Sequence, residues 1–198
     1  METIKNTLSK IEEGKLEKKQ KLLDAGLALF TEKGFKETSV QDIVEKANIA
    51  KGTFYLYYKD KYELQDNLIM KISSDLFNEA LDNLKKHNIS KIDKQIIFII
   101  DYVIDKLAKS PLLFKLIGKN MSLGVFNKQL TNIVSIDNLS VIDLFKKSIK
   151  DNNVYVKNPE VTLYMIIELA GATCFNSITQ NKPLPIEEYK PYLNKMIT

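Results

Sequence analysis

The 198-residue sequence contains no arginine and no tryptophan, and it has one cysteine and one histidine. A lone cysteine, Cys174, can form neither an internal disulfide nor a Cys-x-x-Cys metal site. A lone histidine, His87, excludes zinc sites built on histidine pairs and leaves little for histidine-based catalysis. Since no phosphate-loop motif is present either, we expect no catalytic residues, no metal and no cofactor, and an enzyme is the least favoured class of protein.

Long apolar runs are also missing. No stretch of about 18 uninterrupted apolar residues occurs, so we expect no membrane span. Residues 1–21 are charged throughout and lack the apolar core of a signal peptide, which favours a cytoplasmic protein. Hydrophobic residues make up 44% of the chain and charged residues 27%, which is ordinary for a globular protein.

The absence of arginine restricts how the chain can read a nucleic acid. The net charge of +4 is compatible with such a partner, but residues 1–64 hold 12 lysines and 11 acidic residues and have a net charge of only +1. The bidentate contact between arginine and guanine, the commonest specific base contact, is unavailable. Base reading would therefore use lysine, glutamine, threonine, tyrosine or apolar contacts.

The dominant pattern in the sequence is helical periodicity. Apolar residues recur at helical spacing, glycine is scarce and alternating strand patterns are absent. The apolar stripe of the first helix includes Leu16, Leu22, Leu29 and Phe30, and residues 1–14 form an N-terminal extension that is either helical or a loose arm. The periodicity predicts an all-α fold with a looser stretch over 121–127 and with helices over about 15–33, 40–47, 51–57, 61–86, 92–109, 111–120, 128–151, 159–180 and 186–197.

The segment around residues 34–58 carries the signals of a helix-turn-helix. Gly34 suits the left-handed cap that ends the first helix. Ser39 is a good N-cap for the next helix, and Asp42 completes a variant of the capping box three residues later. Residues 48–50 then form a short turn. In a helix-turn-helix the second short helix enters the major groove of DNA.

The residue types on that second helix fit a DNA contact. We expect Phe54 and Tyr58 to pack inward, while Gly52 would let the helix approach DNA closely. The hydroxyl, methyl and ammonium groups left outside suit phosphate oxygens and base edges. The outward residues are then Lys51, Thr53, Tyr55 and Tyr57.

These residues carry a specific resemblance. The matching run is Gly34-Phe35, Thr38-Ser39-Val40, Ile43 and Ala47, then Lys51-Gly52-Thr53-Phe54-Tyr55-Leu56-Tyr57-Tyr58 and Lys59-Asp60-Lys61-Tyr62-Glu63-Leu64. It resembles the N-terminal domain of TetR-type regulators, whose pattern is a glycine after the first helix, a Thr-Thr/Ser-x-x-x-Ile stretch and a Lys-Gly-x-Phe/Leu-Tyr-x-Tyr/His-Phe-x-x-Lys-x-x-Leu run. The family usually has phenylalanine at Tyr58, and both rings can pack there.

The resemblance implies a three-helix DNA-binding domain over 15–61 and an all-helical effector-binding and dimerisation domain over 62–198. It implies a homodimer on a palindromic operator, most often a repressor that a small molecule releases. Phosphate contacts would fall on Thr38, Ser39, Tyr57 and Lys61. Base or groove contacts would fall on Gln41, Lys51, Gly52, Thr53 and Tyr55.

The C-terminal part offers weaker signals. Its apolar, tyrosine-bearing character favours a hydrophobic or aromatic effector, although a plain helical core would have the same composition. The segments 136–150 and 159–180 are rich in large apolar residues and are candidates for a two-fold symmetric dimer interface, with an internal core as the alternative. The candidate pocket residues are Phe98, Tyr102, Phe114, Met121, Phe126 and Tyr164.

Two alternatives stay open at this point. Control by a protein partner instead of a small ligand is the second class of function, and a bound ligand or an open apolar cavity would count against it. Cys174 lies beside small residues and suits a close-packed helix face, while a redox-sensing role depends on its exposure. His87 is expected to be exposed at the C-terminal end of a helix.

Overall fold

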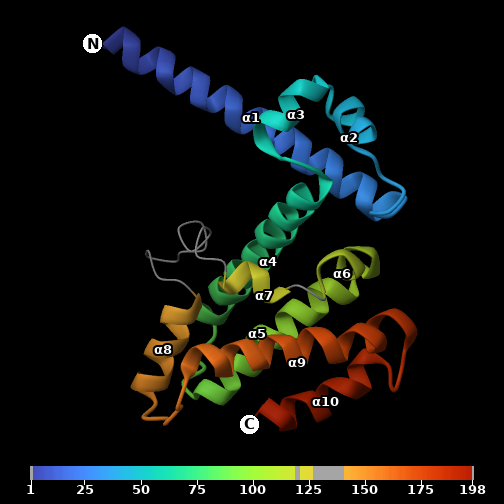
Figure 1. Cartoon of the computed structure of the whole chain (residues 1–198). Coiled ribbons are helices and arrows are strands. Elements are labelled where there is room, and N and C mark those ends of the chain that lie inside the picture. The colour runs from blue at the N-terminus through green and yellow to red at the C-terminus, as the bar shows by residue number, and fades with distance from the viewer. Residues whose placement is uncertain (1, 119–120, 127–140, 198) are drawn as a thin grey trace. The chain divides into compact units, whose positions relative to one another are not determined.

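The computed structural model describes residues 2–118, 121–126 and 141–197, and every regular element in these ranges is a helix (Figure 1). The chain divides into two compact units, residues 1–68 and 69–198. The expected all-α fold is confirmed. In chain order the helices are α1 (Glu2–Glu32), α2 (Val40–Ala47), α3 (Lys51–Tyr57), α4 (Lys61–Lys85), α5 (Ile92–Ala108), α6 (Pro111–Ile117), α7 (Met121–Phe126), α8 (Val141–Asp151), α9 (Pro159–Gln180) and α10 (Ile186–Ile197).

The helix bounds resolve one open question and correct one expectation. Residues 2–14 continue α1 as a helix. The looser stretch predicted over 121–127 is wrong, because Met121–Phe126 forms helix α7. This helix contacts α8 and α9, and such packing overrides the low helix propensity of Gly124. Residues 127–140 lie outside the described residues, so the first half of the helix expected over 128–151 is not addressed.

The buried side of α1 begins later than the sequence pattern suggests. Leu22, Leu29 and Phe30 are buried as expected, but Leu16 is 70% exposed. Figure 1 shows the N-terminal end of α1 extending past α2 and α3, which agrees with the exposure of Leu16. Further along, a Cβ added to Gly26 would lie only 2.5 Å from Leu64 Cδ2, which shows how closely α1 and the first turns of α4 approach.

One side chain of α4 holds the loop between α1 and α2. The Lys61 ammonium donates hydrogen bonds to the carbonyl oxygens of Phe35 at 3.0 Å, Lys36 at 3.2 Å and Thr38 at 2.7 Å. An ammonium group has three N–H donors, so these three carbonyls use all of them. The same nitrogen lies 4.6 Å from the centroid of the Phe35 ring, in a cation–π contact. The loop that leads into α2 is therefore fixed to α4.

Residues 69–198 form a second helical core. Its fully or nearly fully buried side chains include Ala80, Leu107, Phe114, Ile117 and Leu193. Cys174 also lies in this core, and burial raises the pKa of its thiol to about 11. Because the thiolate is the reactive form and the thiol is inaccessible, this position does not support redox sensing.

Helix α9 is the one described helix that is long and apolar enough to cross a membrane by length and composition. One face of it, including Leu163, Ile167 and Cys174, is buried within the C-terminal unit. It contacts α5, α6, α7, α8 and α10. The core helix of a helical domain has the same length and composition, and this packing accounts for the apolar inner face.

The candidate dimer segments differ in the surface that they expose. Residues 136–140 lie outside the described residues, and α8 buries Phe145 and Ile149 while presenting lysines outward. The dimer face expected on α8 stays a prediction, and the core of the unit uses Phe145 and Ile149 of this helix. Exposed large apolar side chains lie instead on α9 and α10, at Val161, Tyr164, Met165, Tyr192 and Met196.

Replacing Lys61 by methionine keeps the aliphatic stem and removes the three donors. We expect Lys61→Met to lower the free energy of unfolding by about 1–3 kcal/mol, because three backbone carbonyls lose a charged partner. Chemical denaturation followed by circular dichroism measures this change. Lys59→Met is the matched control, since Lys59 is exposed nearby and should change stability little. Equal losses in the two variants would contradict the role of Lys61.

Candidate functional site

The turn between α2 and α3 has the expected helix-turn-helix form. Asn48 ends α2 with a left-handed φ of 53°, which asparagine tolerates better than most residues. The Ile49 N–H donates to the Val44 carbonyl at 2.9 Å and closes the turn. Phe54 and Tyr58 are buried as expected, so one side of α3 is fixed against the unit and the other remains outside.

The N-terminus of α2 has a complete capping box. The Ser39 hydroxyl accepts from the Asp42 N–H at 3.1 Å, and the Asp42 carboxylate accepts from the Ser39 N–H at 2.7 Å and its hydroxyl at 2.8 Å. The Lys33 ammonium lies 2.9 Å from the same carboxylate. The Ser39 N–H and Lys33 hold the pKa of Asp42 well below its usual range. Ser39 is exposed, but its hydroxyl proton is directed at Asp42, so it must rotate to reach a phosphate.

The outward side of α3 differs from the expected set in one respect. Thr53 and Tyr57 are only partly exposed, whereas Tyr55 is 52% and Leu56 81% exposed. Sequence reasoning did not single out Leu56. A helical projection places it four residues after Gly52 and beside Tyr55, on the side opposite Phe54. That spacing was the available signal.

Gly52 has no role in the packing of its own chain. A Cβ built on it meets no atom within 4 Å, and its backbone does not require a positive φ. Elsewhere in this unit, Gly34 has a φ of +91° and Gly26 lies against Leu64, so both glycines have an internal reason. The absence of a side chain at Gly52 therefore leaves room at the surface of α3 for an external group.

Polar groups flank this surface on both short helices. Lys51 is exposed, and its ammonium has no hydrogen-bond or ion-pair partner among the described residues. Gln41 is also exposed, and its amide donates to Glu45 Oε1 at 2.7 Å one turn along α2. Such an exposed bond between side chains four residues apart is weak, so the amide can be redirected.

Two of the predicted DNA contacts, Thr38 and Lys61, have internal hydrogen-bond partners in this structure. Thr38 is 1% exposed, and its hydroxyl donates to the Gly34 carbonyl at 2.8 Å. The Lys61 donors are all directed at the loop carbonyls described above. In both cases an internal hydrogen bond has taken the group that was expected to reach a phosphate. Thr38 and Lys61 both bind backbone carbonyls next to α2, so they stabilise the loop that leads into this helix.

Tyr58 is buried as expected, and it carries a polar hydroxyl group into the buried part of the unit. Its ring is buried against Phe54, with the ring centroids 5.7 Å apart. Its hydroxyl is buried with no hydrogen-bond partner among the described residues, and burial raises the pKa of this phenol above its ordinary value. A buried hydroxyl without a partner opposes folding, so phenylalanine would suit this position at least as well.

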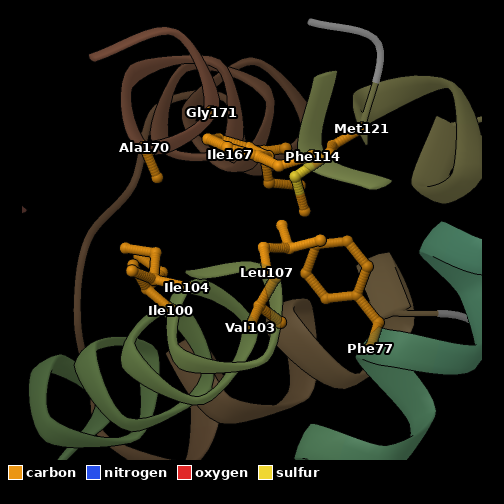
Figure 2. A pocket seen from close by; sticks show the side chains of 10 residues that line it. All are labelled: Phe77, Ile100, Val103, Ile104, Leu107, Phe114, Met121, Ile167, Ala170 and Gly171. Atoms are coloured by element: carbon orange, nitrogen blue, oxygen red, sulfur yellow. The ribbon is translucent and has the colours of Figure 1, made fainter. Parts of the chain in front are cut away.

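The C-terminal unit contains an apolar cavity of about 30 Å³ between α5 and α9 (Figure 2). Phe114 and Met121 lie on its wall, as expected for pocket residues. Figure 2 shows α9 residues facing α5 residues across the space, with Phe77 of α4 at one side. Among the described residues, no group of three or more histidine, cysteine or acidic residues is placed to hold a metal ion.

The other four predicted pocket residues do not line this cavity. Phe98 stacks on Tyr102, and the Tyr102 hydroxyl donates to Glu79 on α4 at 2.6 Å. His87, which is exposed, packs against the other side of Phe98. These side chains belong to a cluster on α4 and α5 outside the cavity wall.

Phe126 and Tyr164 form a second pair of this kind. Their ring centroids lie 5.7 Å apart in an edge-to-face contact, and Tyr164 is 47% exposed. The wall of the cavity is mostly aliphatic, with Phe77 and Phe114 as its two rings, because the inward positions of α5 carry isoleucine, valine and leucine.

Comparisons with known proteins agree with this geometry. Residues 22–68 match the model of the family described as bacterial regulatory proteins, tetR family. The HTH-type transcriptional regulator YhgD of Bacillus subtilis is 24% identical over 180 residues, covering 87% of this chain and 90% of that protein. The biofilm operon icaADBC HTH-type negative transcriptional regulator IcaR of Staphylococcus aureus is 30% identical over 87 residues, covering 44% of this chain and 46% of that protein.

Solved structures share the same fold. The transcriptional regulator FadR of Bacillus subtilis, crystallised in complex with stearoyl-CoA, superposes with a TM-score of 0.62 at 16% identity, covering 90% of this chain and 96% of that one. This likeness concerns the fold. Together, the helix-turn-helix geometry, the family match over residues 22–68 and the relative that spans most of the chain lead to one conclusion: residues 22–68 form a DNA-binding domain of the tetR family, and the chain as a whole is similar to HTH-type transcriptional regulators.

Proposed function

We propose that this protein is a homodimeric repressor that binds a palindromic operator through α3 and leaves it when a small apolar molecule binds in the C-terminal unit. The observation that carries the DNA-binding half is the outward side of α3. It combines a glycine that internal packing does not require with an exposed Tyr55 and Leu56. The negative regulator IcaR, which matches the N-terminal part of the chain, supports repression.

The contacts divide between base edges and phosphates. Lys51 offers an ammonium to guanine or phosphate, Thr53 and Leu56 offer methyl groups to thymine, and Gly52 permits close approach. Tyr55 and Gln41 complete the groove contacts. Ser39 and Tyr57 have hydroxyls that suit phosphate oxygens. Thr38 and Lys61 act indirectly, by positioning the loop before α2.

The effector acts on the equilibrium between two arrangements of the dimer. Helix α4 begins in the N-terminal unit and ends in the C-terminal unit, so a ligand that displaces its second half also acts on the DNA-binding helices. The ligand shifts the equilibrium only as far as its affinities for the two arrangements differ. Phe77 of α4 lies on the wall of the cavity, which favours a small ligand over a protein partner.

Replacing Gly52 by alanine adds one methyl group, which should affect DNA binding without impairing folding. We expect Gly52→Ala to leave stability unchanged or raise it by up to about 1 kcal/mol, since alanine favours a helix. The same methyl group should weaken operator binding about tenfold or more, because it enters a closely packed interface. Gel shifts at fixed salt, with DNA upstream of the protein's own gene, measure the second effect.

Gly14→Ala is the matched control for this experiment. A Cβ at Gly14 also meets nothing within 4 Å, and Gly14 lies in α1 away from the helix-turn-helix. The control should bind operator DNA as the wild type does. An unchanged operator affinity of Gly52→Ala would contradict close approach of α3 to DNA.

Leu56 should read the 5-methyl group of thymine. Burying one methyl group contributes about 0.8 kcal/mol, so replacing the contacted thymine by uracil should weaken wild-type binding about fourfold. The DNA affinity of Leu56→Ala should be the same for thymine and uracil. The losses of affinity from Leu56→Ala and from uracil should therefore not add when the two changes are combined. Leu16→Ala, a substitution of another exposed leucine, should leave the uracil effect intact. Equal uracil effects in Leu56→Ala and wild type would exclude this contact.

The dimer is proposed to form through α9 and α10, which together expose Val161, Tyr164, Met165, Tyr192 and Met196. Met165→Glu should place an unpaired charge in the interface and raise the dimer dissociation constant more than about a hundredfold. Sedimentation velocity distinguishes monomer from dimer. Leu112→Glu on α6, where Leu112 is 55% exposed, should leave the dimer intact. A Met165→Glu variant that stays dimeric at low micromolar concentration would contradict this interface.

A further inference from the structure

Two apolar cavities in the C-terminal unit lie end to end. The cavity of about 30 Å³ shown in Figure 2 and a second cavity of about 90 Å³ share Phe77, Ile100 and Ile167 on their walls. The first reaches inward to Phe114 and Met121. The second continues between α5 and α8. The shared side chains therefore separate two halves of one apolar path.

The shape of this path limits the ligands that fit. A dry cavity of about 150 Å³ lined by leucine, isoleucine and phenylalanine suffices for a benzene ring, and each of these two cavities is smaller. Water is a poor occupant of the inner cavity, because a buried water needs two to four polar partners and the wall residues are apolar. A flexible unbranched chain can divide its length between the two halves, whereas a rigid ring system needs one larger space.

The outer end of the path is polar. The second cavity has two polar residues on its wall, Gln95 of α5 and Ser148 of α8, and the Ser148 hydroxyl donates to Gln95 Oε1 at 2.7 Å. These two residues also line an open hollow at the surface, together with Lys147 and Asp151. The hydrogen bond between α5 and α8 thus lies where the apolar path meets solvent.

We propose that this path binds one unbranched alkyl chain whose polar head, a hydrogen-bond acceptor, lies at Gln95 and Ser148. The inference rests on the proposed effector site and names the class of molecule that fills it. The tail lies along the isoleucine, valine and leucine side chains of α5 and ends beside Phe114. The head displaces the bond between Ser148 and Gln95, which frees the Ser148 hydroxyl to donate to it. The Gln95 amide donates one N–H to the Ile89 carbonyl at 2.8 Å, and its second N–H can donate to the head. Lys147 stands at the same opening for an anionic head.

A series of alkanoates and 1-alkanols from three to ten carbons tests the proposal on the full-length protein. Affinity, measured by calorimetry below the micelle concentration, should rise about fourfold with each added methylene until the chain fills the path, and then level off. Naphthalene, a rigid aromatic probe, should bind more weakly than the best alkanol. Affinity that is independent of chain length, or tighter binding of naphthalene, would overturn the proposal.

Substitution of a shared wall residue gives the second test. Ile100→Phe should stop the rise at shorter chains while leaving the shortest ligands unaffected. Ile97→Phe is the matched control, because Ile97 lies one turn earlier on α5 and lines neither cavity, so its profile should equal that of the wild type. Ile167→Phe, from the opposite wall, replaces Ile100→Phe if the latter does not fold by circular dichroism. A wild-type chain-length profile in a folded variant of either kind would overturn the proposal.

The head group is tested separately. Lys147→Ala should weaken the binding of alkanoates but not of alkanols, because Lys147 lies at the opening where an anionic head would be. Lys146→Ala should change the binding of neither class, because Lys146 pairs with Glu160 outside the hollow. Ser148→Ala should weaken both classes severalfold, and an unchanged affinity for both would contradict the head position. Operator gel shifts keep the two proposals distinct. If alkyl compounds bind but do not release the operator, only the proposed effector role is contradicted. If the protein binds the operator but no alkyl compound, only the inference about the alkyl chain is contradicted.

Discussion

The ammonium group of Lys61 is the interaction on which the geometry of the N-terminal unit depends. It joins the first turn of α4 to three successive parts of the loop before α2, and it lies against the Phe35 ring. The loop contributes Thr38 to the interior and presents Ser39 as the cap of α2. Since α2 and α3 are joined by a short turn, fixing the start of α2 also fixes the recognition helix. Lys61, predicted from the sequence as a DNA contact, thus anchors the loop before α2 in this structure.

Some polar side chains of the N-terminal unit bind groups within the unit, and others are exposed at its surface. Asp42, Thr38 and Lys61 satisfy backbone groups within the unit, and they leave Lys51, Tyr55 and Gln41 for the outside. Without arginine and with little net charge, this surface cannot rely on a strong field or on bidentate guanine contacts. Close approach at Gly52 and an apolar contact at Leu56 are the means that remain. The thymine contact that we propose for Leu56 is one that such a surface can make.

The C-terminal unit leaves apolar space that a well-packed core would fill. Protein interiors are dense, so cavities lined by isoleucine, leucine and phenylalanine reduce stability unless something occupies them. The cavity walls come from α4, α5, α8 and α9, and α4 continues into the N-terminal unit. In the proposed mechanism, a ligand that fills this space stabilises one arrangement of the helices that carry the DNA-binding surface. The inner side of helix α9 lines the cavity, and its outer side is exposed.

The sequence by itself determined the features that depend on neighbours along the chain. Ser39 and Asp42 form the predicted capping box, and the bounds of α2, α3 and α9 agree with the periodicity because local hydrogen bonding and side-chain spacing set them. Tertiary structure alone decided which groups remain available. Thr38 and Lys61 turn inward because partners 4 to 26 residues away accept their protons, and Leu56 is exposed because no helix covers it. Phe98 and Tyr102 miss the cavity for the same reason: the orientation of α5, which only packing against distant helices sets, turns isoleucines toward it and these two rings away.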